Sequence, residues 1–259
     1  AVAGAFYPGD AASLRAEVDA LLANAAPRKL TPKLLIAPHA GYVYSGPIAA
    51  SAYRLLENLA PKPSRVVLLG PAHTVAFRGV ALPAARALET PLGAVPVDED
   101  LVAVARRFDF VFDDARAHAR EHSLEVHLPF LQRALGAFSV LPLCVGQVDA
   151  GDVAALLDAV WGGPETLIVI SSDLSHYLPW SEAKQVDGDT ARMILRCDAA
   201  ELDGDRACGT YPLGGALLAA KRHGLTPTVL DLRNSGDTAG DRSRVVGYGA
   251  FAFCEGGAR

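Results

Sequence analysis

The segment Lys33–Pro38 (KLLIAP) is apolar on both of its alternating faces and runs directly into His39. A run of this kind suits a strand that is covered on both sides of a sheet. Five further runs share this character and end in polar, glycine or proline residues: Arg65–Gly70, Phe138–Leu143, Leu167–Ser171, Pro227–Leu232 and Val245–Phe253. The sequence therefore predicts six short, largely buried strands.

Helical patterns lie between these strands. The first follows Asp10, a suitable N-cap, and repeats apolar residues from Leu14 to Leu22. Six segments have this pattern: Ala11–Ala25, Pro47–Leu59, Ser123–Leu135, Ala150–Val160, Ser181–Arg196 and Leu213–Arg222. The alternation predicts a three-layer α/β/α sandwich with a mostly parallel central sheet. No linker is long enough to separate domains, so we expect one domain over residues 1–259.

Composition narrows the function classes. The 259 residues are 51% hydrophobic and carry 24 Lys and Arg against 29 Asp and Glu, a net charge of −5. The hydrophobic fraction excludes a largely disordered chain. The negative net charge argues against binding of nucleic acid through overall charge. No apolar run reaches the length that spans a membrane. Four dispersed cysteines without a CxxC pair favour free thiols and a cytoplasmic location.

Histidine and aspartate residues follow the predicted strands at their carboxyl ends. They are His39, His73, Asp173, His176 and Asp237. Ligands of open parallel sheets bind at this edge, so we expect these side chains to converge. Two imidazoles and a carboxylate suit divalent iron with open coordination positions, and a further histidine beside an aspartate suits proton transfer. The alternative is a purely structural hydrogen-bond network.

Other polar segments are candidates for the walls of such a pocket. Glu121 and His122 precede a predicted helix, with Ser123 as a candidate N-cap, and an ordinary capped helix is the alternative. A glycine-flanked segment after His39 carries two tyrosines, and a loop before another helix carries one cysteine. These candidate pocket residues are Tyr42, Tyr44 and Cys208. The glycine spacing matches no nucleotide-binding motif.

Several motifs, in order along nearly the whole chain, resemble those of the Memo family, protein B of the AmmeMemoRadiSam set. They are Ala1–Gly9 (AVAGAFYPG), Pro38–Gly46 (PHAGYVYSG), Gly70–His73 (GPAH), Glu121–Glu125 (EHSLE), Ser171–His176 (SSDLSH), Cys208-Gly209 and Asn234–Asp237 (NSGD). That family is similar in fold to the LigB-like catalytic subunit of class III extradiol dioxygenases. Those enzymes hold non-haem Fe(II) with two histidines and one carboxylate.

The resemblance implies roles for particular residues. His39 and His73 would bind the metal, and His176 would be the acid/base residue with Asp173 beside it. Animal members are similar but place a cysteine where the Asn234–Asp237 segment lies, which makes Asp237 the expected third ligand here, with Thr238 as the neighbouring alternative. A carboxylate favours Fe(II), with Cu or Zn as alternatives.

Three functions remain open from the sequence. The first is a metal-dependent oxidoreductase related to extradiol dioxygenases, acting on a small molecule. The second is a non-catalytic module that binds a metal, a peptide or partners, namely the radical-SAM and AMMECR1-like proteins that bacterial members commonly accompany. The third is a zinc hydrolase, since two histidines and an aspartate also suit Zn(II).

Overall fold

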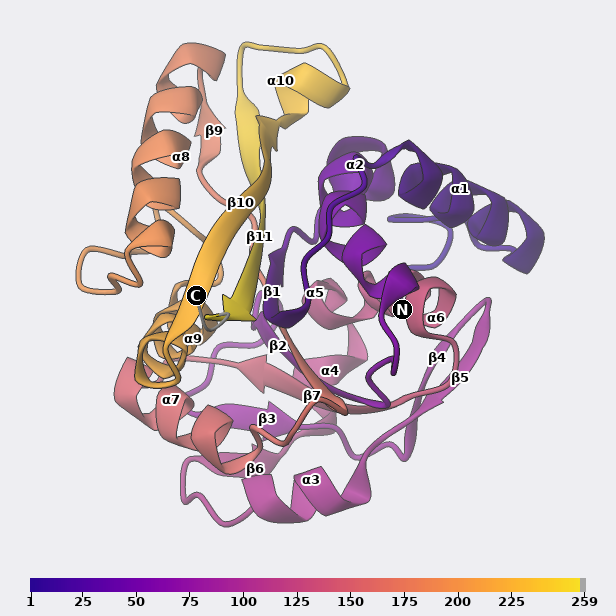
Figure 1. The fold of residues 1–259 in the computed structure, drawn as a ribbon, viewed down its shortest axis with the longest axis vertical. Coiled ribbons are helices and arrows are strands. Elements are labelled where there is room, and N and C mark those ends of the chain that lie inside the picture. Colours follow the sequence, from indigo (N-terminus) through magenta and orange to yellow (C-terminus); the bar gives the residue numbers. More distant parts are fainter. Residues whose placement is uncertain (257–259) are drawn as a thin grey trace.

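A nine-stranded mixed sheet forms the centre of the computed structural model, which describes residues 1–256 (Figure 1). Along the sheet the strands follow the order β10, β11, β1, β8, β2, β7, β3, β6, and β9 pairs with the end of β11. Their bounds are β1 Pro32–Ala37, β2 Arg65–Pro71, β3 Val80–Leu82, β6 Val111–Asp113, β7 Ser139–Val145, β8 Thr166–Ser171, β9 His176–Leu178, β10 Leu225–Asn234 and β11 Val245–Glu255. A separate hairpin joins β4 (Ala87–Thr90) to β5 (Gly93–Pro96).

The middle of the sheet is parallel, as the apolar runs predict. β1, β8, β2 and β7 are parallel neighbours, with Leu34 opposite Ile168 and Val66 opposite Leu167. β11 is antiparallel to both β1 and β10, so β10 runs in the same direction as β1. The carboxyl ends of β1, β8, β2 and β10 therefore lie at one edge of the sheet.

Helices cover both faces of the sheet. Leu35 and Leu68 pack with α1, α2 and α6, whereas Leu34 and Leu69 pack with the helices of the opposite layer. Figure 1 shows α1 and α2 on one side of the strands and α7, α8 and α9 on the other. The helices of eight or more residues are α1 Ala11–Asn24, α2 Tyr42–Tyr53, α6 Leu128–Leu135, α7 Ala150–Ala159, α8 Trp180–Leu195 and α9 Thr210–Arg222. The three-layer α/β/α prediction is confirmed.

The remaining helices are short and depart from the expected pattern. They are η1 Arg54–Asn58, α3 Glu99–Ala105, α4 Ala115–Ala119, α5 His122–Glu125 and α10 Ser235–Thr238. The helix expected over Ser123–Leu135 is broken into α5 and α6. Asp10 caps α1 as expected, but Glu121, not Ser123, caps α5, because its carboxylate accepts the Ser123 N–H. Within residues 1–256, no helix combines the length and apolar character needed to cross a bilayer.

Candidate metal centre

Two histidines meet at the carboxyl edge of the central strands. His39 follows β1 and His73 follows β2, with β8 between them. The two imidazole rings lie 5.1 Å apart, nearly perpendicular to each other. Cys208, in the loop before α9, completes a group in which one ligand atom of each residue lies within 4.8 Å of the other two.

A buried hydrogen-bond network fixes the orientation of His39. Ser171 Oγ lies 2.6 Å from the Ser123 carbonyl oxygen, 2.6 Å from His39 Nδ1 and 2.8 Å from His127 Nε2. The Ser171 hydroxyl donates its hydrogen bond to the Ser123 carbonyl. Its oxygen therefore accepts hydrogen bonds from the imidazoles of His39 and His127. The Tyr53 hydroxyl lies 2.7 Å from His127 Nδ1 and donates to it. His39 therefore carries its proton on Nδ1 and keeps the Nε2 lone pair free.

Both histidines in this network are neutral. Burial, together with neighbouring imidazoles, lowers the pKa of His39 well below its ordinary value. Burial lowers the pKa of His127 to about 3. Neutral imidazole is the form that binds a metal.

Glu121 fixes His73 in the same manner. Its Oε1 lies 2.9 Å from His73 Nδ1, and its Oε2 accepts the His73 backbone N–H at 2.6 Å. Burial acts to raise the pKa of Glu121, but the hydrogen bonds from His73 and Ser123 outweigh it and lower the pKa to about 2. The ionised carboxylate accepts the hydrogen bond that Nδ1–H of His73 donates, which leaves Nε2 of His73 as the available ligand atom.

Cys208 supplies the third donor. Its Sγ lies 3.3 Å from His39 Nε2. A nitrogen and a sulfur bound to one ion at roughly 2.0 and 2.3 Å with tetrahedral geometry are about 3.5 Å apart. Burial and the charge of Asp173 raise the thiol pKa well above its ordinary value, so in the metal-free protein the S–H proton faces Nε2. The three residues fit a transition-metal ion that would replace this proton.

Asp237 does not join this group, which corrects the expected third ligand. Its Oδ1 accepts the indole N–H of Trp180 at 2.8 Å, and its Oδ2 accepts the Asn234 backbone N–H, as the capping box of α10. The neighbouring Thr238 hydroxyl donates to the Ser235 carbonyl. β11 separates β10 from β1, so these residues lie at the same edge but apart from His39.

A second group of possible ligands contains His73, Glu121 and His122. Glu121 Oε1 lies 2.9 Å from Nδ1 of His73 and 3.4 Å from Nδ1 of His122. The Glu121 carboxylate already accepts a hydrogen bond from His73, so these short distances are explained without a bound metal. The ring of His122 stacks on His73 and packs at 5.4 Å from His39.

The positions of Asp173 and His176 revise their expected pairing. Asp173 Oδ1 accepts the His39 backbone N–H at 2.8 Å, and Oδ2 lies 4.0 Å from His39 Nε2. His176 Nδ1 instead donates to the Leu174 carbonyl at 2.8 Å. Burial raises the pKa of Asp173 to about 7 and lowers that of His176. Asp173 therefore holds the His39 backbone, and Nε2 of neutral His176 has no hydrogen-bond partner within residues 1–256, so it can accept a proton.

A cavity of about 450 Å³ opens beside this group. Its lining includes Tyr44, Asp173, His176 and six further residues around them: Phe6, Gly41, His122, Tyr177, Arg244 and Tyr248. Tyr42, which the sequence placed at the pocket, lies in the core instead, where its hydroxyl donates to the Val126 carbonyl.

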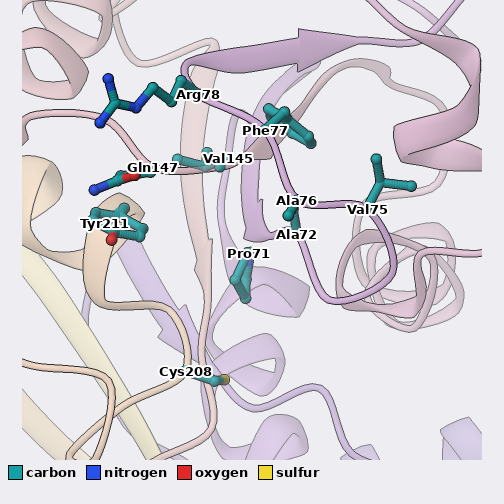
Figure 2. A pocket seen from close by; sticks show the side chains of 11 residues that line it. Pro71, Ala72, Val75, Ala76, Phe77, Arg78, Val145, Gln147, Cys208 and Tyr211 are labelled. Atoms are coloured by element: carbon teal, nitrogen blue, oxygen red, sulfur yellow. The ribbon is translucent and has the colours of Figure 1, made fainter.

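Cys208 borders a different cavity, also about 450 Å³ (Figure 2). Figure 2 shows the side chains of Arg78, Gln147 and Tyr211 close together, and Cys208 at the other end. Cys208 thus lines one cavity, and Asp173 and His176 line the other.

Sequence reasoning missed Ser171 and His127 as parts of the site. Both are buried and look like ordinary strand and helix residues in the sequence. The assignment of Cys208 had one available signal, because the Cys208-Gly209 pair is among the family-like motifs, although the sequence alone gave it no ligand role. The position of Cys208 beside His39 depends on how the loop before α9 is placed in the tertiary structure.

The family model described as "Memo-like protein" matches residues 1–252. A "MEMO1 family protein" of Aquifex aeolicus (strain VF5) is 40% identical over 264 residues, covering 98% of this chain and 97% of the relative. The "MEMO1 family protein MK0963" of Methanopyrus kandleri is 36% identical over 281 residues, covering 99% and 98%. The crystal structure of the uncharacterized protein JW3007 from Escherichia coli K12 has a TM-score of 0.51 at 16% identity, covering 84% of this chain and 98% of that one, and shares the fold.

Proposed function

Because this chain belongs to the family of Memo-like proteins, we propose that it is a metal-dependent oxidoreductase whose ion is held by His39, His73 and Cys208. The observation that carries the proposal is the convergence of two oriented imidazole nitrogens and one sulfur within 4.8 Å. Such a bound ion would supply Lewis-acid and electron-transfer chemistry at the edge of the sheet.

The surroundings of the group favour catalysis over a structural metal site. Structural sites enclose their ion with four protein ligands, whereas catalytic sites keep a position open. Here there are three protein donors and not four, and Asp173, whose carboxylate oxygen lies 4.0 Å from His39 Nε2, lines a cavity together with His176. The free Nε2 of His176 would accept a proton from a bound substrate.

The donor set alters which metal is expected. A carboxylate in the third position would favour iron, but a thiolate with two imidazoles also suits copper and zinc. We propose a redox-active ion, iron or copper, as the native metal. Zinc in that place would instead support the hydrolase alternative.

Reconstitution under anaerobic conditions tests the function. The metal-free protein is loaded with Fe(II), Cu(I) or Zn(II), the bound metal is measured by elemental analysis, and oxygen uptake is followed with a panel of catechols and other diols. We expect one equivalent of metal and oxygen uptake with iron or copper only. Binding of one equivalent of metal without oxygen uptake on any compound of the panel would contradict the oxidoreductase proposal.

A further inference from the structure

One peptide group connects a buried carboxylate to the imidazole of His176. The amide N–H of Ser175 donates to Oδ1 of Asp187 at 3.0 Å. The carbonyl of the same Leu174–Ser175 peptide group accepts the hydrogen bond from Nδ1 of His176 at 2.8 Å. A trans peptide group is planar, and its N–H and C=O point in opposite directions. Asp187 therefore holds one end of the unit to which His176 is bonded at the other end.

The backbone on both sides of this peptide group is fixed by β11. The Leu174 N–H donates to the Gly247 carbonyl, and the Gly247 N–H donates to the Ser175 carbonyl, both at 2.8 Å. Ser175 is fully buried, so water does not reach its N–H. Within residues 1–256, Asp187 is the one acceptor for that N–H. Loss of Asp187 would leave a buried donor unpaired, and the peptide group would have to turn to find another acceptor.

Asp187 itself is confined between two elements. It lies on α8 and is 2% exposed. A Cβ added to Gly247 on β11 would lie 2.1 Å from Oδ2 of Asp187, so the strand comes this close only through a glycine. The carboxylate is thus held at Oδ1 by Ser175 and lies at Oδ2 against the backbone of Gly247.

This carboxylate is unfavourable for the stability of the fold. Within the described part of the chain it forms no ion pair, and burial raises the pKa of Asp187 to about 6. Above this pH the folded protein bears the cost of an ionised carboxylate that water does not surround. A group that opposes folding and is bonded to the loop of a candidate site favours a role in that site.

We propose that Asp187 is the positioning residue of His176 and acts through the Leu174–Ser175 peptide group. Its negative charge polarises the peptide group, which makes the Leu174 carbonyl a stronger acceptor for the Nδ1–H of His176. The proton is thereby kept on Nδ1, and Nε2 stays free at the cavity that His176 lines. This deepens the proposed oxidoreductase, and it rests on that function only for the role of His176 as proton acceptor.

Proton and ¹⁵N NMR of the chelator-treated, metal-free protein tests the proposal at a pH of about 8, where Asp187 is ionised. The measured quantities are the chemical shift of the Ser175 amide proton and the ratio of Nδ1–H to Nε2–H tautomers of His176. Asp187→Asn keeps a carbonyl acceptor of the same size but loses the charge. We expect the Ser175 amide proton to move upfield, because hydrogen bonds to charged acceptors are about twice as strong.

In the same variant the His176 tautomer ratio should fall by about twofold or more, because the Leu174 carbonyl becomes a weaker acceptor. Asp187→Ala removes the acceptor altogether and should lower the ratio by about three- to tenfold. If Asp187→Ala does not fold, Asp187→Asn decides the question alone.

Asp189→Asn is the matched control, since Asp189 lies on the same helix and forms an ion pair with the exposed Arg192. It should leave both quantities unchanged. An unchanged His176 tautomer ratio in Asp187→Asn, with or without a shift of the Ser175 amide proton, would overturn the proposal, and so would an equal change in Asp189→Asn. A role of Asp187 in folding alone would alter the free energy of unfolding and leave the tautomer ratio constant. Because the measurement needs neither metal nor turnover, a failed oxygen-uptake assay would leave its result intact.

Discussion

The sulfur of Cys208 lies 3.3 Å from Nε2 of His39, a residue 169 positions earlier in the chain. The loop that carries Cys208 is attached to the end of β8, because the Cys208 N–H donates to the Asp173 carbonyl and the Asp173 N–H donates to Cys208 Sγ. β8 is the parallel neighbour of β1, which ends just before His39. The sheet thus brings a thiol to an imidazole whose lone pair is already directed toward it.

Cys208→Ser should abolish stoichiometric metal binding, whereas Asp237→Asn should leave it unchanged. The serine oxygen is a poor substitute for a thiolate toward soft metals, and Asp237 is engaged with Trp180 outside the ligand group. Metal content by elemental analysis after equal loading checks both variants. If Asp237→Asn loses the metal and Cys208→Ser retains it, the result would support the carboxylate ligand that the sequence predicted and contradict the Cys208 ligand.

Ser171→Ala should lower metal affinity by about 10- to 100-fold, because it removes the acceptor that holds His39 by its Nδ1 proton. Tyr53→Phe acts one step further away, through His127, and should have a smaller effect. Competition with a chromophoric chelator measures affinity, and ¹⁵N chemical shifts of the imidazoles report the His39 tautomer. An unchanged tautomer and affinity in Ser171→Ala would contradict the network.

His176→Gln should keep the metal and lose oxygen uptake. His176 is absent from both possible ligand groups, and its Nδ1 is held by the Leu174 carbonyl. The expected loss of rate is of the order of 10²- to 10⁴-fold. Parallel loss of metal, measured on the same sample, would show that His176 is a ligand instead.

Gly215→Ala should destabilise the fold by about 2–3 kcal/mol. A Cβ at this position of α9 would lie 2.4 Å from Val153 Cβ on α7, so the two helices would have to separate. Gly188→Ala on α8 is the control, since its nearest neighbour would be Arg192 Nη1 at 3.7 Å. The control should gain about 0.5–1 kcal/mol from helix propensity. Denaturant unfolding of both variants measures the difference.

Asp187→Asn should gain stability relative to the wild type as the pH rises from about 4 to 7. Burial raises the pKa of Asp187 to about 6, so the native state keeps this proton at pH values where the unfolded chain has lost it. The resulting stabilisation is complete below the unfolded pKa and is lost as pH rises through about 6, with an upper limit of about 3 kcal/mol. Unfolding free energies at several pH values check this, and a pH-independent difference would contradict it.

Local patterns were enough to predict most of the core. The apolar runs of β1, β2, β7 and β8 mark strands buried on both faces, and the positions of His39 and His73 follow from the ends of two of these strands. The short elements between Val80 and Ala119 were not predicted, because segments of three to seven residues carry too little periodicity. The helix around Glu121 was predicted without its break.

By itself, the sequence determined the layered α/β architecture and the edge at which the histidines gather, because buried strands and amphipathic helices leave a periodic signal in the chain. Only the tertiary structure decided that Cys208 and not Asp237 lies beside His39, and that Asp173 binds the backbone of His39 and not the ring of His176. These choices depend on how loops from distant segments meet, and a strand's local pattern carries no information on which loop reaches its end. The hydrogen bonds of Ser171 and Glu121, formed between such segments, then fix which nitrogen of each imidazole is free.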